Sequence, residues 1–371
     1  KYMNWETVDP EKWVPHGYVC IRVDSRGAGN SEGCIDFWSK QEAQDIYECI
    51  EWAAAQPWSS GKVGLLGISY YGINQWAAAA LQPPHLAAIC PFEGCNDNYR
   101  DMARPGGIVC DFFSLWQPVQ VSVVQHGLGS RGKVSRINGM RVSGDVDLSD
   151  EELAANSVNL KEEFLRHELN DEYYMNRTTD LSKVTVPVLS CGNWGGNALH
   201  LRGNVEGFLR AGSKEKFLEI HGLEHFTEFY TDYGREMQKA FFDHYLKGED
   251  TWHQAPVHLR LRNVDGTFQD VDEQEWPIAR TQWTRYYPNT SDMSLSVKPA
   301  NGGDKSFEAM GDWLTFMTEP LKEDMVIAGP LSAKLYVKST TEDADIFITV
   351  RVFDPDGKDV TFVSASDAHG V

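Results

Sequence analysis

Short apolar runs alternate with amphipathic stretches of helical period along the first part of this chain. Such a run is predicted to be a buried strand, and a stretch with an apolar stripe at every third or fourth residue is predicted to be a helix. The order strand, helix, strand is typical of a mostly parallel sheet covered by helices, because parallel neighbours need a crossover connection. The predicted strands are 17–24, 63–67, 86–92, 186–191 and 216–221, and the predicted helices are 39–56, 70–82, 199–212 and 231–247.

Two segments outside this alternation predict two further parts. Residues 96–180 contain a stretch rich in Gly, Ser, Arg and Asp and then a helical run at 150–167, which we interpret as a cap inserted over the sheet edge. After about residue 251 the apolar period changes from 3.6 to 2, which predicts an antiparallel sandwich. The period-2 runs include 257–262, 333–338 and 346–352. The predicted domains are an α/β domain in two parts, 1–95 and 181–250, the cap at 96–180, and the sandwich at 251–371.

Composition excludes some partners. The net charge of −20 argues against nucleic acid and against an anionic membrane surface, because both carry phosphates that would be repelled. No apolar run approaches the roughly 18 residues of a membrane span. Seven cysteines without regular spacing favour a reducing compartment, so we expect a cytoplasmic protein. We expect no cofactor and no metal, since His253 and His258 have no neighbours at ligand spacing. The sequence leaves open whether the protein forms a homo-oligomer.

The strongest chemical signal is Gly67-Ile68-Ser69-Tyr70-Tyr71-Gly72, between a short apolar strand and an amphipathic helix. A serine on a tight strand-to-helix turn is exposed above the sheet, where it can act as a nucleophile. The following helix N-terminus offers backbone N–H groups to a developing oxyanion, and the N–H of Tyr70 is the expected donor. The pattern departs from the usual one, because the second glycine is Gly72 and not residue 71.

Several motifs stand out along the chain: residues 17–33, Glu51-Trp52, Gln56-Pro57-Trp58, the Ser69 turn, Pro83-Pro84-His85-Leu86, Arg202-Gly203-Asn204 and the helix ending FFDHYLKG. Together they resemble the cocaine esterase / X-prolyl dipeptidyl-peptidase family of CocE/NonD-type serine hydrolases. The resemblance implies an α/β-hydrolase sheet, a helical cap, a C-terminal jelly-roll sandwich, and a Ser-His-acid triad acting on esters or amides. It also aligns Lys1 with the family's fourth strand, so we expect the sequence to be a piece of a longer protein.

The sequence offers more than one candidate for the general base and for the acid of the triad. The histidine should follow the last strand of the sheet, and both His221 and His225 do; we favour His221. The family's Asp should follow a Gly-x-Trp segment, but Gly196 occupies that position in Gly192-Asn193-Trp194-Gly195-Gly196-Asn197. We therefore favour Glu93, which follows strand 86–92, as the acid. Asp97 and Asn197 are weaker candidates; Asp97, Arg100 and Asp101 are expected to form a solvated ion-pair cluster.

The preferred function is hydrolysis of a small-molecule ester or amide through an acyl-enzyme intermediate. Ser69 would attack the carbonyl, the histidine would transfer the proton, and Glu93 would orient the imidazole. Trp194, on a loop at the active edge, is expected to bind substrate. Three alternatives remain: an acyltransferase that uses the same serine, an X-prolyl dipeptidyl peptidase, and a non-catalytic binding protein that lost its triad.

Overall fold

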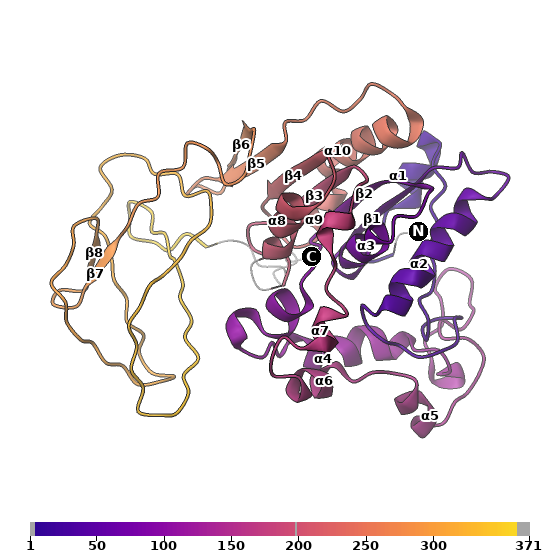
Figure 1. Ribbon diagram of the computed structural model, residues 1–371, viewed down its shortest axis with the longest axis horizontal. Helices are drawn as coiled ribbons and strands as arrows, with labels where there is room; N and C mark the ends of the chain where they lie inside the picture. The colour runs from indigo at the N-terminus through magenta and orange to yellow at the C-terminus, as the bar shows by residue number, and fades with distance from the viewer. Residues whose placement is uncertain (1–3, 197–198, 362–371) are drawn as a thin grey trace. The chain divides into compact units, whose positions relative to one another are not determined.

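The structure, a computed structural model, describes residues 4–196 and 199–361. The chain divides into two compact units after Asp272, and each unit is described by itself. The first unit contains the sheet, the helices that cover it and the cap (Figure 1).

The sheet has six strands in the order β1-β2-β3-β4-β5-β6. Neighbours from β1 through β5 are parallel, as the alternation of strands and helices predicts. All five strands therefore present their carboxyl ends at the same edge, where ligands and catalytic groups of open α/β sheets usually lie. The strands are β1 Val63–Ile68, β2 Leu86–Phe92, β3 Val188–Asn193, β4 Lys216–His221, β5 Val257–Arg262 and β6 Phe268–Glu273.

Helices cover both faces of the sheet, and each face has its own apolar core. On one face, Phe241 and Phe242 of α10 pack against Ile68, Cys90 and Leu189. On the other face, residues of α2 and α3 pack against Leu86, Ile89 and Val188. The longer helices are α2 Lys40–Ala54, α3 Tyr70–Ala80, α8 Leu201–Arg210 and α10 Asp232–Phe242, with the short helices α1 Pro10–Trp13 and α9 Thr227–Tyr230.

The ends of these helices follow from local sequence. The Ser39 side chain accepts a hydrogen bond from the N–H of Glu42 and caps α2. Gly248 has φ +76° and ends the last helical turn after α10, as the sequence predicts. The structure thus confirms the predicted helices near 39–56, 70–82, 199–212 and 231–247, with ends displaced by a few residues.

The cap segment is irregular and mostly helical. The predicted helical run 150–167 is two helices, because it is interrupted between Ala155 and Leu160. The cap packs on the α/β part through an aromatic and aliphatic core that includes Phe37, Trp38 and Ile73 on the sheet side. The cap helices are α4 Phe112–Trp116, α5 Asp150–Ala155, α6 Leu160–Arg166 and α7 Glu172–Met175.

Two strand predictions for this unit need correction. Residues 17–24 are not a buried strand of the sheet: Tyr18 and Cys20 pack on the core, but Val19 and Ile21 are exposed and no ladder pairs the segment within the described residues. Strand β5, which the period-2 pattern assigned to the antiparallel sandwich, pairs in parallel with β4 and extends the sheet. Alternation shows that one face is buried, but not which sheet the strand joins.

The second unit is antiparallel where it is paired. Strands β7 Tyr287–Asn289 and β8 Ser294–Ser296 form a two-stranded antiparallel sheet. The predicted strands 333–338 and 346–352 form no ladder among the described residues of this unit. Their apolar side chains are largely exposed, Leu335 by 51% and Val350 by 60%.

No helix in the described ranges is long and apolar enough to cross a membrane.

All seven cysteines are unpaired; Cys90 and Cys191 are completely buried and Cys20 is partly buried.

Candidate active site

Ser69 stands at the turn between β1 and α3. Its backbone has φ +57° and ψ −115°, a combination that side-chain-bearing residues rarely adopt. Such strain costs on the order of 1–3 kcal/mol and is found mostly at functional sites. The serine directly precedes α3, so the free N–H groups of the helix's first turn, including that of Tyr70, lie beside it. The local geometry is that of a nucleophile turn.

The two glycines around Ser69 are explained by close packing. A Cβ at Gly67 would lie 2.5 Å from the Cβ of Tyr71. A Cβ at Gly72 would lie 2.4 Å from the carbonyl oxygen of Phe92 and 3.1 Å from the Cα of Gly94. Tyr71, by contrast, is 49% exposed and has room for its side chain. The displaced second glycine is therefore the position where α3 touches β2.

Backbone hydrogen bonds join the ends of four strands at this edge. The N–H of Ser69 donates to Phe92 at 3.0 Å, and the N–H of Glu93 donates to Cys191 at 2.8 Å. The N–H of Trp194 donates to the carbonyl of His221 at 2.9 Å. The residues predicted from four separate motifs are thus fixed in one row along the carboxyl edge of the sheet.

Glu93 is completely buried and reaches both candidate histidines. One carboxylate oxygen lies 3.3 Å from Nε2 of His221, and the other lies 4.0 Å from Nδ1 of His225. Glu93 has φ +48°, so its backbone is strained like that of Ser69. A buried carboxylate costs several kcal/mol unless it is paired, which favours a functional reason for its position.

The side chain of Glu93 also occupies the space next to Gly196, where the family resemblance expects the triad Asp. A Cβ added at Gly196 would lie 2.8 Å from Oε2 of Glu93. The carboxylate from the end of β2 therefore stands where a side chain at position 196 would begin.

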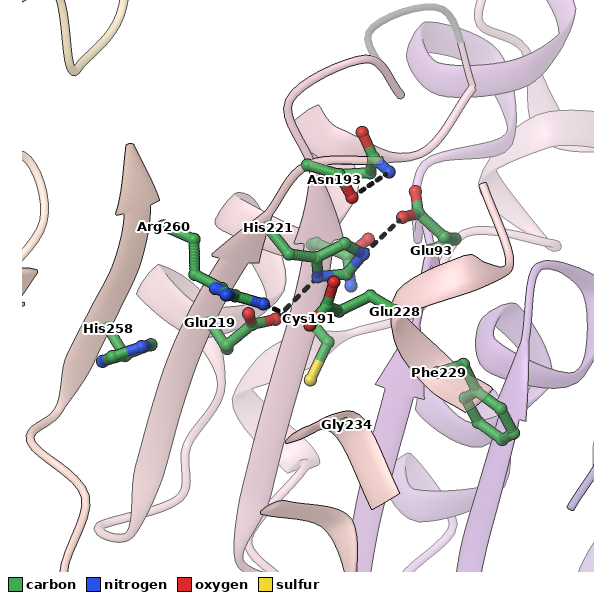
Figure 2. Close-up of polar contacts among 12 residues, drawn as sticks. Glu93, Cys191, Asn193, Glu219, His221, Glu228, Phe229, Gly234, His258 and Arg260 are labelled. Carbon is green, nitrogen blue, oxygen red and sulfur yellow. Dashed lines mark hydrogen bonds and ion pairs between the residues drawn. The ribbon is translucent and has the colours of Figure 1, made fainter. Parts of the chain in front are cut away.

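The two histidines differ in what their nitrogens face. In His221, Nδ1 lies 2.7 Å from Glu219 and Nε2 lies 3.3 Å from Glu93, and the ring is buried between these carboxylates (Figure 2). Burial alone would lower the pKa of His221, but the two carboxylates raise it to about 10. A doubly protonated imidazole has no lone pair with which to accept a proton from serine.

Both nitrogens of His225 also face carboxylates, but its side chain is less buried than that of His221. Its Nδ1 faces Glu93, and its Nε2 lies 3.1 Å from a carboxylate oxygen of Glu6. Burial alone would lower the pKa of His225, but Glu6 and Glu93 outweigh burial and raise it. The ring stacks on that of His200 at 4.9 Å, and burial lowers the pKa of His200, which keeps that ring neutral.

The hydroxyl of Ser69 makes no hydrogen bond within the described part of the chain. The bond between a catalytic serine and its base commonly tightens only when substrate binds. The structure brings Glu93 to both histidines, and ties Ser69 to the same strand end through its backbone.

The remaining candidates have structural contacts. The indole of Trp194 donates to the carbonyl of Arg260 at 2.8 Å and ties its loop to β5. Asp97 pairs with Arg100 at 2.9 Å, while Asp101 is buried and pairs with Arg202 at 2.6 Å, so the expected ion-pair cluster is present but partly buried. Asn197 lies outside the described residues.

Sequence reasoning missed Glu6, His200 and Glu219. Glu219 carried a signal, since a charged residue inside a buried strand needs a partner, and His221 lies two positions on, on the same face of β4. No sequence signal pointed to Glu6. Its position depends on its own backbone conformation, with φ +60°, and on a hydrogen bond that its carbonyl accepts from the N–H of Ile68.

A parallel sheet covered on both faces, a strained serine at a strand-to-helix turn, and a histidine and a buried carboxylate at the same edge define an α/β hydrolase of the serine type. The chain belongs to the X-Pro dipeptidyl-peptidase (S15) family, whose model matches residues 2–227. The model for the X-Pro dipeptidyl-peptidase C-terminal non-catalytic domain matches residues 251–367. The predicted family and fold class are thereby confirmed.

Individual relatives agree with this assignment. The chain is 26% identical to the cocaine esterase of Rhodococcus sp. (strain MB1 Bresler), over 94% of this chain and 72% of that protein. A solved CocE/NonD family hydrolase from Staphylococcus aureus is 34% identical and matches 80% of this chain with a TM-score of 0.69. The match spans 50% of that hydrolase. An α-amino acid ester hydrolase, 18% identical with a TM-score of 0.56 over 81% of this chain and 55% of its own, shares the fold.

Proposed function

We propose that this protein hydrolyses an ester or amide of a small molecule or short peptide through an acyl-enzyme intermediate. Ser69 is the nucleophile, His225 the base, Glu93 the acid, and the N–H of Tyr70 a donor to the oxyanion. The observation that carries the proposal is the carboxylate of Glu93, which is buried beside Gly196 and lies 4.0 Å from the Nδ1 of His225.

The chemistry follows from these roles. Oγ of Ser69 attacks the substrate carbonyl carbon while its proton passes to Nε2 of His225. The oxyanion of the tetrahedral intermediate accepts a hydrogen bond from the N–H of Tyr70. When the intermediate collapses, His225 returns the proton to the leaving group. Water then attacks the acyl-enzyme by the same sequence and releases the acid.

The assignment of the base to His225 departs from the preference for His221 based on sequence. Both nitrogens of His221 face carboxylates, and a raised pKa keeps the ring protonated. The nitrogens of His225 also face carboxylates, Nδ1 toward Glu93 and Nε2 toward Glu6, but its side chain is 16% exposed, against 1% for His221, which supports His225 as the ring that exchanges a proton with substrate.

The substrate class is the open part of the proposal. The family name supports an X-prolyl dipeptidyl peptidase as a second candidate, while the similarity to cocaine esterase supports an ester. Comparing kcat/KM for an aryl ester with kcat/KM for an Xaa-Pro aryl amide distinguishes the esterase from the X-prolyl dipeptidyl peptidase. The unpaired cysteines support a reducing compartment such as the cytoplasm.

The test uses Ser69→Ala and a fluorophosphonate probe on the purified protein. We expect Ser69→Ala to lower kcat for a simple aryl ester by about 10³-fold or more, and to abolish labelling by the probe. His225→Gln should slow labelling by a similar factor, since the serine loses its base. Unchanged turnover in Ser69→Ala, or no labelling of the unmodified protein, would instead favour a non-catalytic binding protein.

A further inference from the structure

Three ionisable side chains, one of them the proposed acid Glu93, are buried in a row at the candidate site. Glu219, His221 and Glu93 are each exposed by 1% or less (Figure 2). His221 lies 2.7 Å from Glu219 and 3.3 Å from Glu93. The mechanism above uses Glu93 but gives no role to the other two. Burying three ionisable groups is costly, so their arrangement requires an explanation.

The charges that face His221 come from several elements. Glu219 lies on the same strand, Glu93 follows β2, and His225 lies on the next loop. Glu228 of α9 is close enough to influence the charge of His221, but its carboxylate pairs with Arg260 at 2.5 Å. Phe92 places its ring 5.8 Å from the imidazole, and Cys191 and Tyr233 lie near Glu219.

These contacts make His221 a cation between two carboxylates. Burial alone would lower the pKa of its ring, but Glu219 and Glu93 raise it to about 10. The N–H at Nδ1 then faces Glu219 at 2.7 Å, while Nε2 lies 3.3 Å from Glu93, within ion-pair distance but without hydrogen-bond geometry. The carboxylate oxygens of Glu93 accept no hydrogen bond of good geometry from the described residues. The imidazolium of His221, 3.3 Å away, is therefore the nearby cation that stabilises the negative charge of Glu93.

We propose that His221, held protonated by Glu219, is a positioning residue that keeps Glu93 ionised and directed at His225. The inference rests on the proposed function, because it assumes that Glu93 orients the base. The row of two carboxylates and one imidazolium carries one net negative charge. That charge is available at Glu93, next to His225, where the imidazolium of the transition state needs it.

The first test is His221→Gln, assayed for kcat across pH. Without the cation, burial favours the neutral form of Glu93, and we expect kcat near neutral pH to fall about 100-fold or more. Buried glutamates without a partner ionise near about pH 8–9. Part of the loss should therefore be recovered as the pH rises through that range, so that the ratio of kcat in His221→Gln to kcat in the unmodified enzyme increases with pH. A loss by the same factor at every pH would indicate a merely structural role and overturn the inference.

The second test needs no catalysis. In ¹⁵N-histidine NMR spectra of the unmodified protein, one ring should keep both N–H protons at about pH 9, far above the usual pKa of histidine. Glu219→Gln should remove this signal at that pH, because one of the two stabilising carboxylates is lost. Absence of a doubly protonated ring in the unmodified protein would contradict the inference even if His221→Gln does not fold.

Asp101→Asn is the matched control. Asp101 is also a buried carboxylate in an ion pair, with Arg202, but it does not face His221. It should lower thermal stability without changing the pH profile or the NMR signal. Failure of Ser69→Ala to reduce turnover would refute the proposed function. Normal dependence on Ser69 together with an unaltered profile in His221→Gln would refute only the role of His221.

Discussion

Moving the proposed acid from residue 93 to residue 196 would test the proposed triad most directly. Glu93→Ala removes the carboxylate that faces Nδ1 of His225, and we expect kcat for an aryl ester to fall about 10³–10⁴-fold. This corresponds to about 4–5.5 kcal/mol of transition-state stabilisation. Gly196→Asp is then added to the same protein. Its Cβ would lie 2.8 Å from where Oε2 of Glu93 stood, so the new carboxylate enters the vacated space.

We expect the double variant to recover at least about 10-fold of the lost kcat. Full recovery is not expected, since a displacement of about 1 Å costs on the order of 10²-fold. The backbone at Gly196 is not in the left-handed region, so an Asp there is not strained. Gly196→Asp alone should lower activity, because the new side chain collides with Glu93 and places a second carboxylate beside it.

The assay is kcat for the aryl ester, with the rate of fluorophosphonate labelling as a second measure of serine reactivity and thermal unfolding as a check of folding. Gly195→Asp combined with Glu93→Ala is the matched control. A Cβ at Gly195 would approach Asn193 and not Glu93, so this carboxylate should not rescue. A Glu93→Ala, Gly196→Asp variant that is folded but no faster than Glu93→Ala would refute the assignment of the acid.

Two other predictions concern the serine turn and the base. Gly72→Ala should lower the free energy of unfolding in urea by about 1–3 kcal/mol, because its Cβ would lie 2.4 Å from the carbonyl oxygen of Phe92. Gly302→Ala is the control, because a Cβ at that position meets open space. Equal stabilities of the two variants would contradict the packing argument. The raised pKa of His225 means that kcat/KM should rise with pH through a midpoint above about 6.5, since the base must be neutral. Glu6→Gln should move this midpoint to lower pH, and an unchanged midpoint would show that Glu6 does not influence the base.

The sequence predicted the parts of the fold that depend on local pattern. Strands β1 to β4 and the helices between them carry strong periodicity and clear end signals, and they form where expected. Ser69 and Glu93 were found because each directly follows an apolar strand. The assignments of segment 17–24 to the parallel sheet and of strand β5 to the sandwich were wrong, because neither an apolar run nor an alternating pattern reveals which partner a strand pairs with, or whether it pairs at all.

The choice between His221 and His225 could not be made from the sequence. Both follow β4, and the difference lies in which carboxylate each ring nitrogen faces. That depends on the turn at Leu223, which has φ +66°, and on the distant residue Glu6. Contacts between residues more than 200 positions apart, such as that of Glu6 with His225, leave no local pattern.

The position of Glu93 explains why the proposed acid is a glutamate. Ile68 of β1 aligns with Phe92 of β2, and Phe92 aligns with Cys191 of β3, so Ser69 and Glu93 follow neighbouring strands at the same level. A carboxylate on β2 begins one strand spacing, about 4.8 Å, nearer to the serine than one on β3. It must therefore extend sideways toward β3 to reach the Nδ1 side of the histidine. The extra methylene of glutamate supplies this reach, and its Oε2 ends 2.8 Å from the Cβ position of residue 196. The absence of a side chain at Gly196 thus leaves room for the longer side chain of Glu93, the proposed acid.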